Sequence, residues 1–379
     1  MHICFVAPFG LGQKTTVWAR TLPLAQALVA HGVQVSIVLP PWDTPADAGR
    51  RWQESGVTLI NVATAGGVAP TTARMLHEID RLHPSLVHIV KPRAHAGLVQ
   101  WWLWQRRKCR HQRPLLLDVD DWEQAWAPIN RYPRLTAYFL AWQEEWGLRH
   151  ADGVTAASQW LRSRTEAYNP GVPVLYLPNG VDAEPGQLIW QPPGLGDVLF
   201  FTRFVEVEPA WLAAFARTLY AKRPQTHLLI GGSPVQSGLD APFRRALATL
   251  EQIHWLGYLP ASVMPALYAR ISCAIFPAAD VPLQQAKCSV RMATMSLSGV
   301  PIVASAVGEQ RTYGEATGTV LVPAGASPAL FADHVIAVLE NETRPPAPRR
   351  RTPAPLLNRY GWSQLGARLF DFYTKFNPS

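Results

Sequence analysis

The stretch AKCSVRMATMSLSGVPIVAS, residues 286–305, decides the fold of this chain because it places a short helix directly before an apolar strand. Ser289 has the side chain of a helix N-cap, and Lys287 and Arg291 stand on either side of it. A glycine and a proline then end the helix, and residues 302–304 continue as a strand. Because helix N–H groups and nearby cations both attract anions, the stretch predicts a phosphate-binding helix start.

Short apolar runs alternate with longer amphipathic segments on both sides of this stretch, which is typical of strand–helix–strand units in parallel sheets. In the first half the expected strands are 3–7, 33–39, 57–62, 86–90, 115–118, 153–156 and 174–177. In the second half they are 198–203, 227–230, 253–256, 273–276, 302–304 and 319–322. A chain of 379 residues exceeds one ordinary core, so we expect two domains, each with its own sheet.

Residues 181–196 are rich in proline, glycine and acidic residues and show no periodicity, so we expect them to link the two domains.

Open parallel sheets bind ligands outside the carboxyl ends of their strands. Two such sheets that face each other therefore predict one cleft between the domains.

The formal net charge of +8 predicts an anionic partner, and nucleotides, nucleic acid and an acidic membrane surface all satisfy it. The four cysteines show no C-x-x-C spacing, and Cys4 and Cys273 fall in expected core strands, which favours a reducing cytosol over disulfides or a zinc site. The first residues lack a secretory signal pattern, and no run of about 18 apolar residues occurs. We therefore expect a cytoplasmic protein without a membrane span.

The segment PFGLGQKTT, residues 8–16, follows the first expected strand and is rich in glycine. A dinucleotide-binding fingerprint needs a third glycine where Thr15 stands, and a P-loop needs a lysine directly after the glycine, where Gln13 stands. A nucleotide-dependent oxidoreductase or an NTPase would need these spacing failures to be harmless. The spacing disfavours both classes.

Three segments in the same order resemble the family 4 glycosyltransferases: the PFGLG turn, the PNGVD turn at 178–182 and SGVPIVAS at 298–305. The resemblance implies an α/β GT-B fold, in which two Rossmann-like domains present parallel sheets to an interdomain cleft. It places the amino-terminal, acceptor-side domain at 1–183, the nucleotide-sugar-binding domain at 184–361, and a helix that crosses back to the first domain at 362–379. The implied reaction moves a sugar from a nucleotide-sugar to a hydroxyl of a glycan, glycolipid or lipid-linked acceptor, with retained configuration and without metal or cofactor.

In the first domain, the resemblance implies that Gly10 and Gly12 let the backbone approach a substrate and that Lys14 contacts phosphate. A plain tight turn with a solvated lysine is the alternative. Asp120 and Asp121 follow the expected strand at 115–118, near the position where the family often carries a histidine beside the sugar. Helix capping by one aspartate and metal binding by the DVD string are the alternatives for this acidic segment.

In the second domain, Arg203 matches the family arginine that meets the donor phosphate, whereas Glu208 and Pro209 stand where the family has lysine and glycine. A salt bridge between Arg203 and Glu206 is the alternative. The E-x7-E pair of the family aligns with an alanine and with Thr294, whose hydroxyl could bond a ribose.

We expect Lys287 and Arg291 to compensate for the lost carboxylates with positive charge near the phosphates, and Asp280, Gln284 and Gln285 to reach the sugar hydroxyls. The expected catalytic residues are Asp120, Asp121, Arg203 and Lys287. The expected donor-binding residues are Gly10, Gly12, Lys14, Asp280, Ser289, Val290, Arg291 and Thr294.

Two basic segments remain. Residues 99–113 combine three tryptophans with five cations at a predicted helix end, which suits either an interfacial helix on anionic lipid or a packed helix with a solvated tail. No nucleic-acid module surrounds them, so nucleic-acid binding is not expected. The proline- and arginine-rich loop from residue 344 is a solvated linker or a second lipid contact.

The loss of both motif carboxylates keeps a second function class open, namely an inactive scaffold that retains the glycosyltransferase fold and binds within a glycan assembly pathway. Binding of a nucleoside diphosphate separates the two classes, because the enzyme must bind one. Peripheral contact with the inner face of an anionic membrane is compatible with both.

Overall fold

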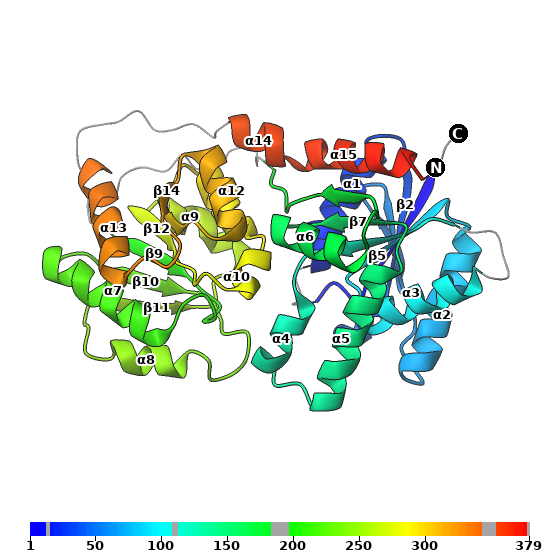
Figure 1. Ribbon diagram of the computed structural model, residues 1–379, viewed down its shortest axis with the longest axis horizontal. Coiled ribbons are helices and arrows are strands. Elements are labelled where there is room, and N and C mark those ends of the chain that lie inside the picture. The colour runs from blue at the N-terminus through cyan, green and yellow to red at the C-terminus, as the bar shows by residue number, and fades with distance from the viewer. Residues whose placement is uncertain (13–15, 108–112, 183–196, 343–353, 377–379) are drawn as a thin grey trace. The chain divides into compact units, whose positions relative to one another are not determined.

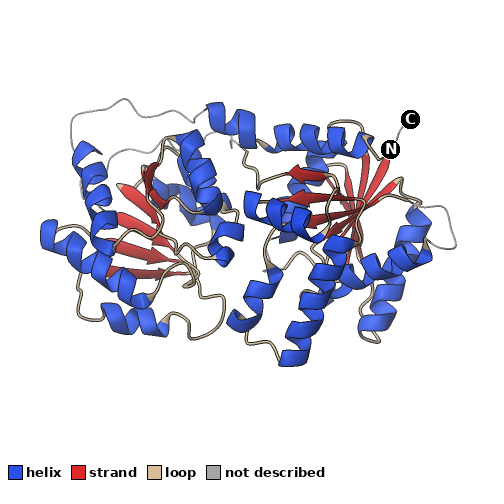
Figure 2. Cartoon of the chain, in the orientation of Figure 1, coloured by secondary structure: helices blue, strands red, loops and turns tan. Residues whose placement is uncertain are grey.

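The computed structural model describes residues 1–12, 16–107, 113–182, 197–342 and 354–376 (Figure 1). Strands and helices alternate along the described chain, and the strands form two sheets that helices flank (Figure 2). Both sheets are parallel except for one antiparallel edge pair, β3 with β4. The expected α/β architecture with two parallel sheets is therefore confirmed.

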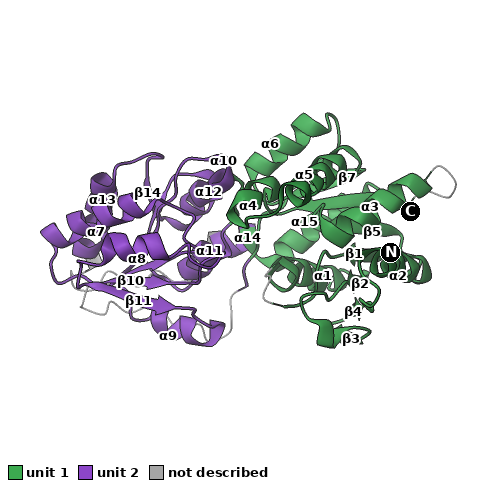
Figure 3. Cartoon of the chain, turned by 90° about the horizontal axis from the view of Figure 1, so that it is seen from below, with its two compact units in different colours: residues 1–180, 286–288, 360–379 green, residues 181–285, 289–359 purple. Residues whose placement is uncertain are grey.

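The chain divides into two compact units (Figure 3). The first unit contains residues 1–180, 286–288 and 360–379, and the second contains 181–285 and 289–359. Most of the expected linker, residues 183–196, lies outside the described residues, as does the expected loop from residue 344 up to 353.

The first unit has an eight-stranded sheet of order β3-β4-β2-β1-β5-β6-β7-β8. Its strands are β1 His2–Val6, β2 Gln34–Leu39, β3 Arg51–Glu54, β4 Val57–Asn61, β5 Leu86–Val90, β6 Leu115–Val119, β7 Gly153–Ala156 and β8 Val174–Tyr176. Its helices are a π-helical turn at Val17–Thr21, α1 Leu22–Val29, a 3₁₀ turn at Pro45–Asp47, α2 Val68–Leu82, α3 Ala94–Arg106, α4 Glu123–Ile129, α5 Arg134–Arg149, α6 Gln159–Tyr168 and α15 Trp362–Thr374. The central strands are buried on both faces, because helices cover both sides of the sheet.

The carboxyl-terminal helix α15 is part of the first unit's core. It runs along α1, where a Cβ on Gly366 would stand 2.4 Å from the Cβ of Ala27, so only glycine permits this close approach (Figure 1). Leu365, Leu369 and Tyr373 of α15 are fully buried in the same apolar cluster as β1 and β2. The last helix of the chain therefore stabilises the first sheet.

The second unit has a six-stranded parallel sheet of order β11-β10-β9-β12-β13-β14. Its strands are β9 Val198–Phe201, β10 Leu228–Gly231, β11 Ile253–Gly257, β12 Cys273–Phe276, β13 Ile302–Ser305 and β14 Val320–Val322. The remaining helices are α7 Pro209–Lys222, α8 Ala241–Leu247, a 3₁₀ turn at Ala261–Val263, α9 Met264–Tyr268, α10 Pro282–Ala286, α11 Val290–Leu297, α12 Gly308–Thr317, α13 Pro328–Glu342 and α14 Ala354–Tyr360.

Every expected strand is present, with ends that differ by at most two residues. The expectation of a strand over 198–203 is wrong at its end, because β9 stops at Phe201 and Arg203 lies in the following turn. Strand β3 was not expected, because its sequence RWQE is polar and its side chains are largely exposed at the sheet edge.

Each sheet reverses its strand order at one place, beside β1 and β5 in the first unit and beside β9 and β12 in the second. At such a place the connections leave the sheet in opposite directions, so the carboxyl ends of the two strands border an open crevice. A ligand site is therefore expected among the residues that follow these four strands.

Candidate functional site

The turn after β9 exposes a cation. The Glu206 carboxylate accepts hydrogen bonds from the Thr202 hydroxyl at 2.7 Å and from the backbone N–H groups of Arg203 and Val205 at 3.2 and 3.1 Å. Because Glu206 fixes the backbone of Arg203, the expected alternative of a side-chain salt bridge is wrong. Among the described residues, the Arg203 guanidinium forms no ion pair, and the side chain is exposed.

Arg291 lies close to Arg203, at the start of α11. Its guanidinium carbon stands 3.3 Å from the centre of the Phe201 ring, so the last residue of β9 supports it. Desolvation by the surrounding protein lowers the pKa of Arg291 to about 10, Tyr268 opposes the shift, and the positive charge of Arg203 adds to it. The Glu206 carboxylate raises the pKa of Arg291 and so partly offsets the Arg203 charge, yet two cations beside one carboxylate leave a net positive charge that favours an anionic ligand.

The other expected residues of this segment differ from the sequence-based picture. Ser289 occupies the N-cap of α11, but its side chain makes no capping hydrogen bond. The Thr294 hydroxyl donates to the backbone carbonyl of Val290 at 3.0 Å, within the helix. Asp280 is exposed and accepts from the Gln285 amide at 2.7 Å, whereas Gln284 is buried and donates to the backbone carbonyl of Val205.

In the first unit, a buried charge network joins the sheet to two helices. Arg20, on the π-helical turn, donates through Nε and a terminal nitrogen to both oxygens of Asp118, at 2.8 and 2.7 Å. The Thr155 hydroxyl donates to Asp118 at 2.6 Å and also contacts His88, whose other ring nitrogen meets the Tyr373 hydroxyl of α15 at 2.6 Å. This network was not expected, because Arg20 and Asp118 are 98 positions apart in the sequence.

Burial sets the protonation of this network. Burial favours the neutral form of Asp118, but the Arg20 charge outweighs it and holds the pKa of that carboxyl below its usual range. Burial lowers the pKa of His88 to about 4, so the imidazole is neutral at pH 7. The arrangement fixes strands β5, β6 and β7 to one another and to α15.

A second acidic group lies where β5 and β6 end. Lys91 pairs with Asp120 at 2.9 Å and with Glu123 at 2.7 Å, and Arg93 pairs with the other oxygen of Glu123. Burial raises the pKa of Glu123, yet Lys91 and Arg93 outweigh it and bring the value down to about 2. Burial raises the pKa of Asp121 to about 6, which leaves this carboxyl partly protonated near neutral pH. The catalytic role expected of Asp120 and Asp121 stays a prediction.

Lys287 lies beside this acidic group. Its ammonium stands 5.2 Å from the centre of the Trp126 ring, and its charge lowers the pKa of Asp121 against the effect of burial. Asn179 holds the next residue, since its amide donates to the Cys288 carbonyl at 2.9 Å. Lys287 and Arg291 fall in different compact units, and the expectation that both flank one phosphate-binding helix end stays a prediction.

Gly10 and Gly12 have a structural partner within the first unit. The Gly10 N–H donates to Asp43 at 2.7 Å, and a Cβ on Gly12 would stand 2.6 Å from the other Asp43 oxygen. A Cβ on Gly10 would stand 2.6 Å from the Thr44 hydroxyl. Because neither glycine has a side chain, the loop that contains Asp43 can pack closely against this turn. Lys14 lies outside the described residues.

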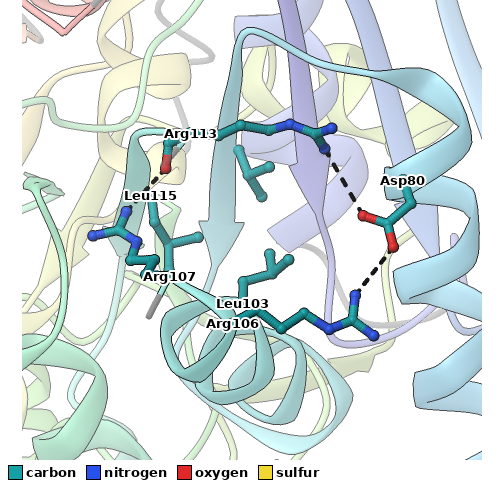
Figure 4. A pocket seen from close by; sticks show the side chains of 7 residues that line it. Asp80, Leu103, Arg106, Arg107, Arg113 and Leu115 are labelled. Atoms are coloured by element: carbon teal, nitrogen blue, oxygen red, sulfur yellow. Dashed lines mark hydrogen bonds and ion pairs between the residues drawn. The ribbon is translucent and has the colours of Figure 1, made fainter. Parts of the chain in front are cut away.

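The basic segment at the end of α3 lines a small pocket of about 90 Å³ (Figure 4). Its arginines are paired internally: Arg106 and Arg113 approach Asp80 at 3.0 and 4.0 Å, and Arg107 pairs with Asp152. Residues 108–112 lie outside the described chain. The described cations of this segment are therefore largely neutralised by protein carboxylates.

In the described residues, no group of three or more histidine, cysteine, aspartate or glutamate side chains is arranged to hold a metal ion. None of the helices in those parts of the chain combines the length and hydropathy that a membrane span needs. Within the described residues, Cys4, Cys273 and Cys288 form no disulfide bond.

Comparisons with known proteins agree with this architecture. The model of Glycosyltransferase Family 4 matches residues 18–185, and that of Glycosyl transferases group 1 matches residues 196–341. A search of curated proteins by sequence found no significant match.

Solved structures show the same fold at low identity. Sucrose-phosphate synthase from Thermosynechococcus elongatus is 16% identical, with a TM-score of 0.70 over 99% of this chain and 98% of that one. HepE from Anabaena, in complex with UDP-glucose, is 15% identical, with a TM-score of 0.67 over 99% and 100% of the two chains. A glycosyltransferase from Rickettsia africae is 11% identical, with a TM-score of 0.64 over 100% and 99%.

The two family matches follow one another along the chain, and each falls on one of the two parallel-sheet units. The chain belongs to the GT-B glycosyltransferases, with a family 4 first half and a group 1 second half.

Proposed function

We propose that this glycosyltransferase moves a sugar from a nucleotide-sugar donor to a hydroxyl acceptor, and that Arg203 and Arg291 hold the donor diphosphate. The observation that carries the proposal is the pair of cations beside the end of β9, where the turn holds one and a ring supports the other. The free N–H groups at the start of α11 add to the same positive potential.

The leaving nucleoside diphosphate gains negative charge as the glycosidic bond breaks, so cations placed at its oxygens lower the barrier. Each charge-assisted hydrogen bond of this kind contributes about 1.5 to 3 kcal/mol. Because two protein cations serve the phosphates, the proposed reaction needs no divalent metal, and we propose that it retains the anomeric configuration. UDP-glucose is the first donor to test, since HepE, which has the same fold, binds it.

The acidic group of the first unit suits the acceptor side. Asp121, with a pKa of about 6, can accept a proton from an acceptor hydroxyl near neutral pH, and Asp120 with Lys91 fixes the adjacent backbone. The proposed acceptor is a hydroxyl of a glycan, a glycolipid or a lipid-linked saccharide. In this proposal the positive charge of Lys287 lowers the pKa of the Asp121 carboxyl.

Calorimetry with UDP, GDP, TDP and ADP tests the donor site. At least one diphosphate should bind, and its nucleotide-sugar should then be consumed in the presence of EDTA when acceptors are supplied. The anomeric signals in the proton spectrum of the product report retention or inversion. If the folded protein binds none of the four nucleotides, the proposal is wrong.

A second candidate function is a nucleotide-binding scaffold without transferase activity. It is favoured by one observation: Ala286 is fully buried and the Thr294 hydroxyl is engaged by its own helix, so neither supplies the acidic group expected at these positions. The scaffold would bind a diphosphate, or none, and would leave every nucleotide-sugar unconsumed. Turnover with the donor that binds therefore separates the two functions.

A further inference from the structure

Helix α5 has an exposed apolar stripe on the first unit. Leu135 is 85% exposed, Tyr138 75%, Phe139 41% and Trp142 38%. These positions follow the i, i+3, i+4, i+7 spacing that places side chains on one helix face. An apolar stripe with this spacing normally faces a core, so its exposure along two helical turns needs an explanation.

The opposite face of α5 holds the helix firmly in place. Gln143, Glu144, Gly147 and Leu148 are buried, and the Gln143 side chain bonds both the N–H and the carbonyl of Ala94 at the start of α3. The stripe is therefore a fixed surface of the first unit. Its aromatic members also order one another, since the rings of Phe139 and Trp142 stack with centroids 5.8 Å apart.

Between residues 131 and 142 the charged residues have one sign, and Glu145, three residues beyond Trp142, pairs with Arg149. Arg131 and Arg134 are exposed at the amino-terminal end of α5, and neither forms an ion pair within the described residues. Residues 131–142 contain no acidic residue. The α3 segment differs, because its exposed Trp102 lies beside arginines that Asp80 and Asp152 already neutralise.

We propose that the exposed stripe of α5, together with Arg131 and Arg134, is a docking surface for a membrane that contains anionic lipid. Tyrosine and tryptophan rings favour the boundary between headgroups and acyl chains, leucine and phenylalanine enter the apolar edge, and unpaired arginines bind lipid phosphates. A second copy of this chain fits the surface less well, because its own stripe would offer no carboxylate to the two arginines. The inference specifies the membrane-contacting surface and does not depend on the donor.

The test uses the full chain and sedimentation with vesicles of phosphatidylcholine alone or with 30% phosphatidylglycerol. The wild type should bind the anionic vesicles at least tenfold more tightly than the neutral ones, and added salt should weaken this binding. The double variants Leu135→Ser with Phe139→Ser, and Arg131→Glu with Arg134→Glu, should each lose tenfold or more. The matched control Trp102→Ser, with a similarly exposed ring on α3, should bind like the wild type.

Three results would overturn the inference: no preference for anionic vesicles, an equal loss in Trp102→Ser, or a stripe variant that changes the oligomeric mass in light scattering while vesicle binding persists. The last result would assign the stripe to a second copy. Thermal melting and nucleotide calorimetry on the same preparations show that each variant is folded, and they report the donor proposal separately from the membrane result.

Discussion

The charged side chains at the carboxyl ends of the two sheets differ in whether they are paired. In the first unit Arg20, Asp118, Lys91 and Glu123 are buried and each has a partner of opposite charge. In the second unit Arg203 and Arg291 are exposed and repel each other. Buried charges must be paired to be tolerated, whereas Arg203 and the partly desolvated Arg291 keep a net positive charge that an anion can neutralise. The first cluster therefore maintains the fold, and the second is available for an anion.

The largest effect should come from breaking the buried pair with Asp118→Asn. The change keeps the shape of the side chain but leaves the Arg20 guanidinium buried without a countercharge, so the free energy of unfolding should fall by about 3 to 5 kcal/mol. Denaturant titration measures this fall. Glu166→Gln, which breaks the exposed pair with Arg162, is the control and should cost less than about 0.5 kcal/mol. A loss below about 1 kcal/mol for Asp118→Asn would mean that water or another group solvates Arg20.

The second effect should appear in binding and not in stability. Arg203→Ala and Arg291→Ala should each weaken binding of the preferred nucleoside diphosphate about tenfold to a hundredfold, as expected for one charge-assisted hydrogen bond of about 1.5 to 3 kcal/mol. Their melting temperatures should match that of the wild type, since relief of the repulsion offsets the lost contact with Phe201. Arg245→Ala, an exposed cation on α8 of the same unit, serves as the control in calorimetry. Unchanged affinity in both variants would place the diphosphate elsewhere.

The contrast between the two clusters also explains which parts of the structure could be predicted from sequence. Buried parallel strands are continuous apolar runs, and all of them were visible in the sequence. Strand β3 was not, because its residues pair at a sheet edge and face water. Arg203 and Arg291 were visible because each follows or precedes an element that the apolar pattern already located.

The buried network could not be predicted in the same way. Arg20 is an ordinary cation in a helical segment, and nothing local indicates a partner 98 residues away. Lys287 was assigned to the donor phosphate because only four positions separate it from Arg291. The helix start at Val290 falls between them, and the chain passes there from the first unit to the second, so nearness in sequence did not reveal that Lys287 contacts Trp126.

A third prediction concerns Glu144, which lacks the close pairing of the other buried carboxylates in the first unit. Burial raises its pKa to about 8, Glu123 adds to the rise, and Arg164, 3.8 Å away, opposes it. The unfolded value is 4.5, so the folded state retains a proton that the unfolded state releases, and stability is lost as pH rises from about 4.5 to about 8. Glu144→Gln, which still accepts from the Gln124 N–H, should be more stable than the wild type at pH 8 by on the order of 2 kcal/mol.

The measurement is the difference in unfolding free energy between the variant and the wild type at pH 5 and at pH 8. His88 also titrates with folding, because its pKa falls from 6.5 to about 4, but it contributes equally to both proteins and cancels. The difference should be small at pH 5 and grow toward pH 8. A difference that stays constant with pH would show that Glu144 is ionised in the folded protein.

The smallest effect, from Lys287→Met, decides to which cluster Lys287 belongs. The methionine keeps an apolar stem against Trp126 but removes the charge that lowers the pKa of Asp121. The acidic limb of the pH–rate profile should therefore move upward from about pH 6 by less than about one unit, while the affinity for the nucleoside diphosphate stays unchanged. Lys222→Met, whose ammonium pairs with Asp333 in the second unit, is the control for loss of one lysine charge. A tenfold loss of diphosphate affinity, with no shift of the acidic limb, would instead assign Lys287 to the cations that bind the donor. Lys287 would then be an exception to the separation between the buried acidic cluster and the exposed phosphate site.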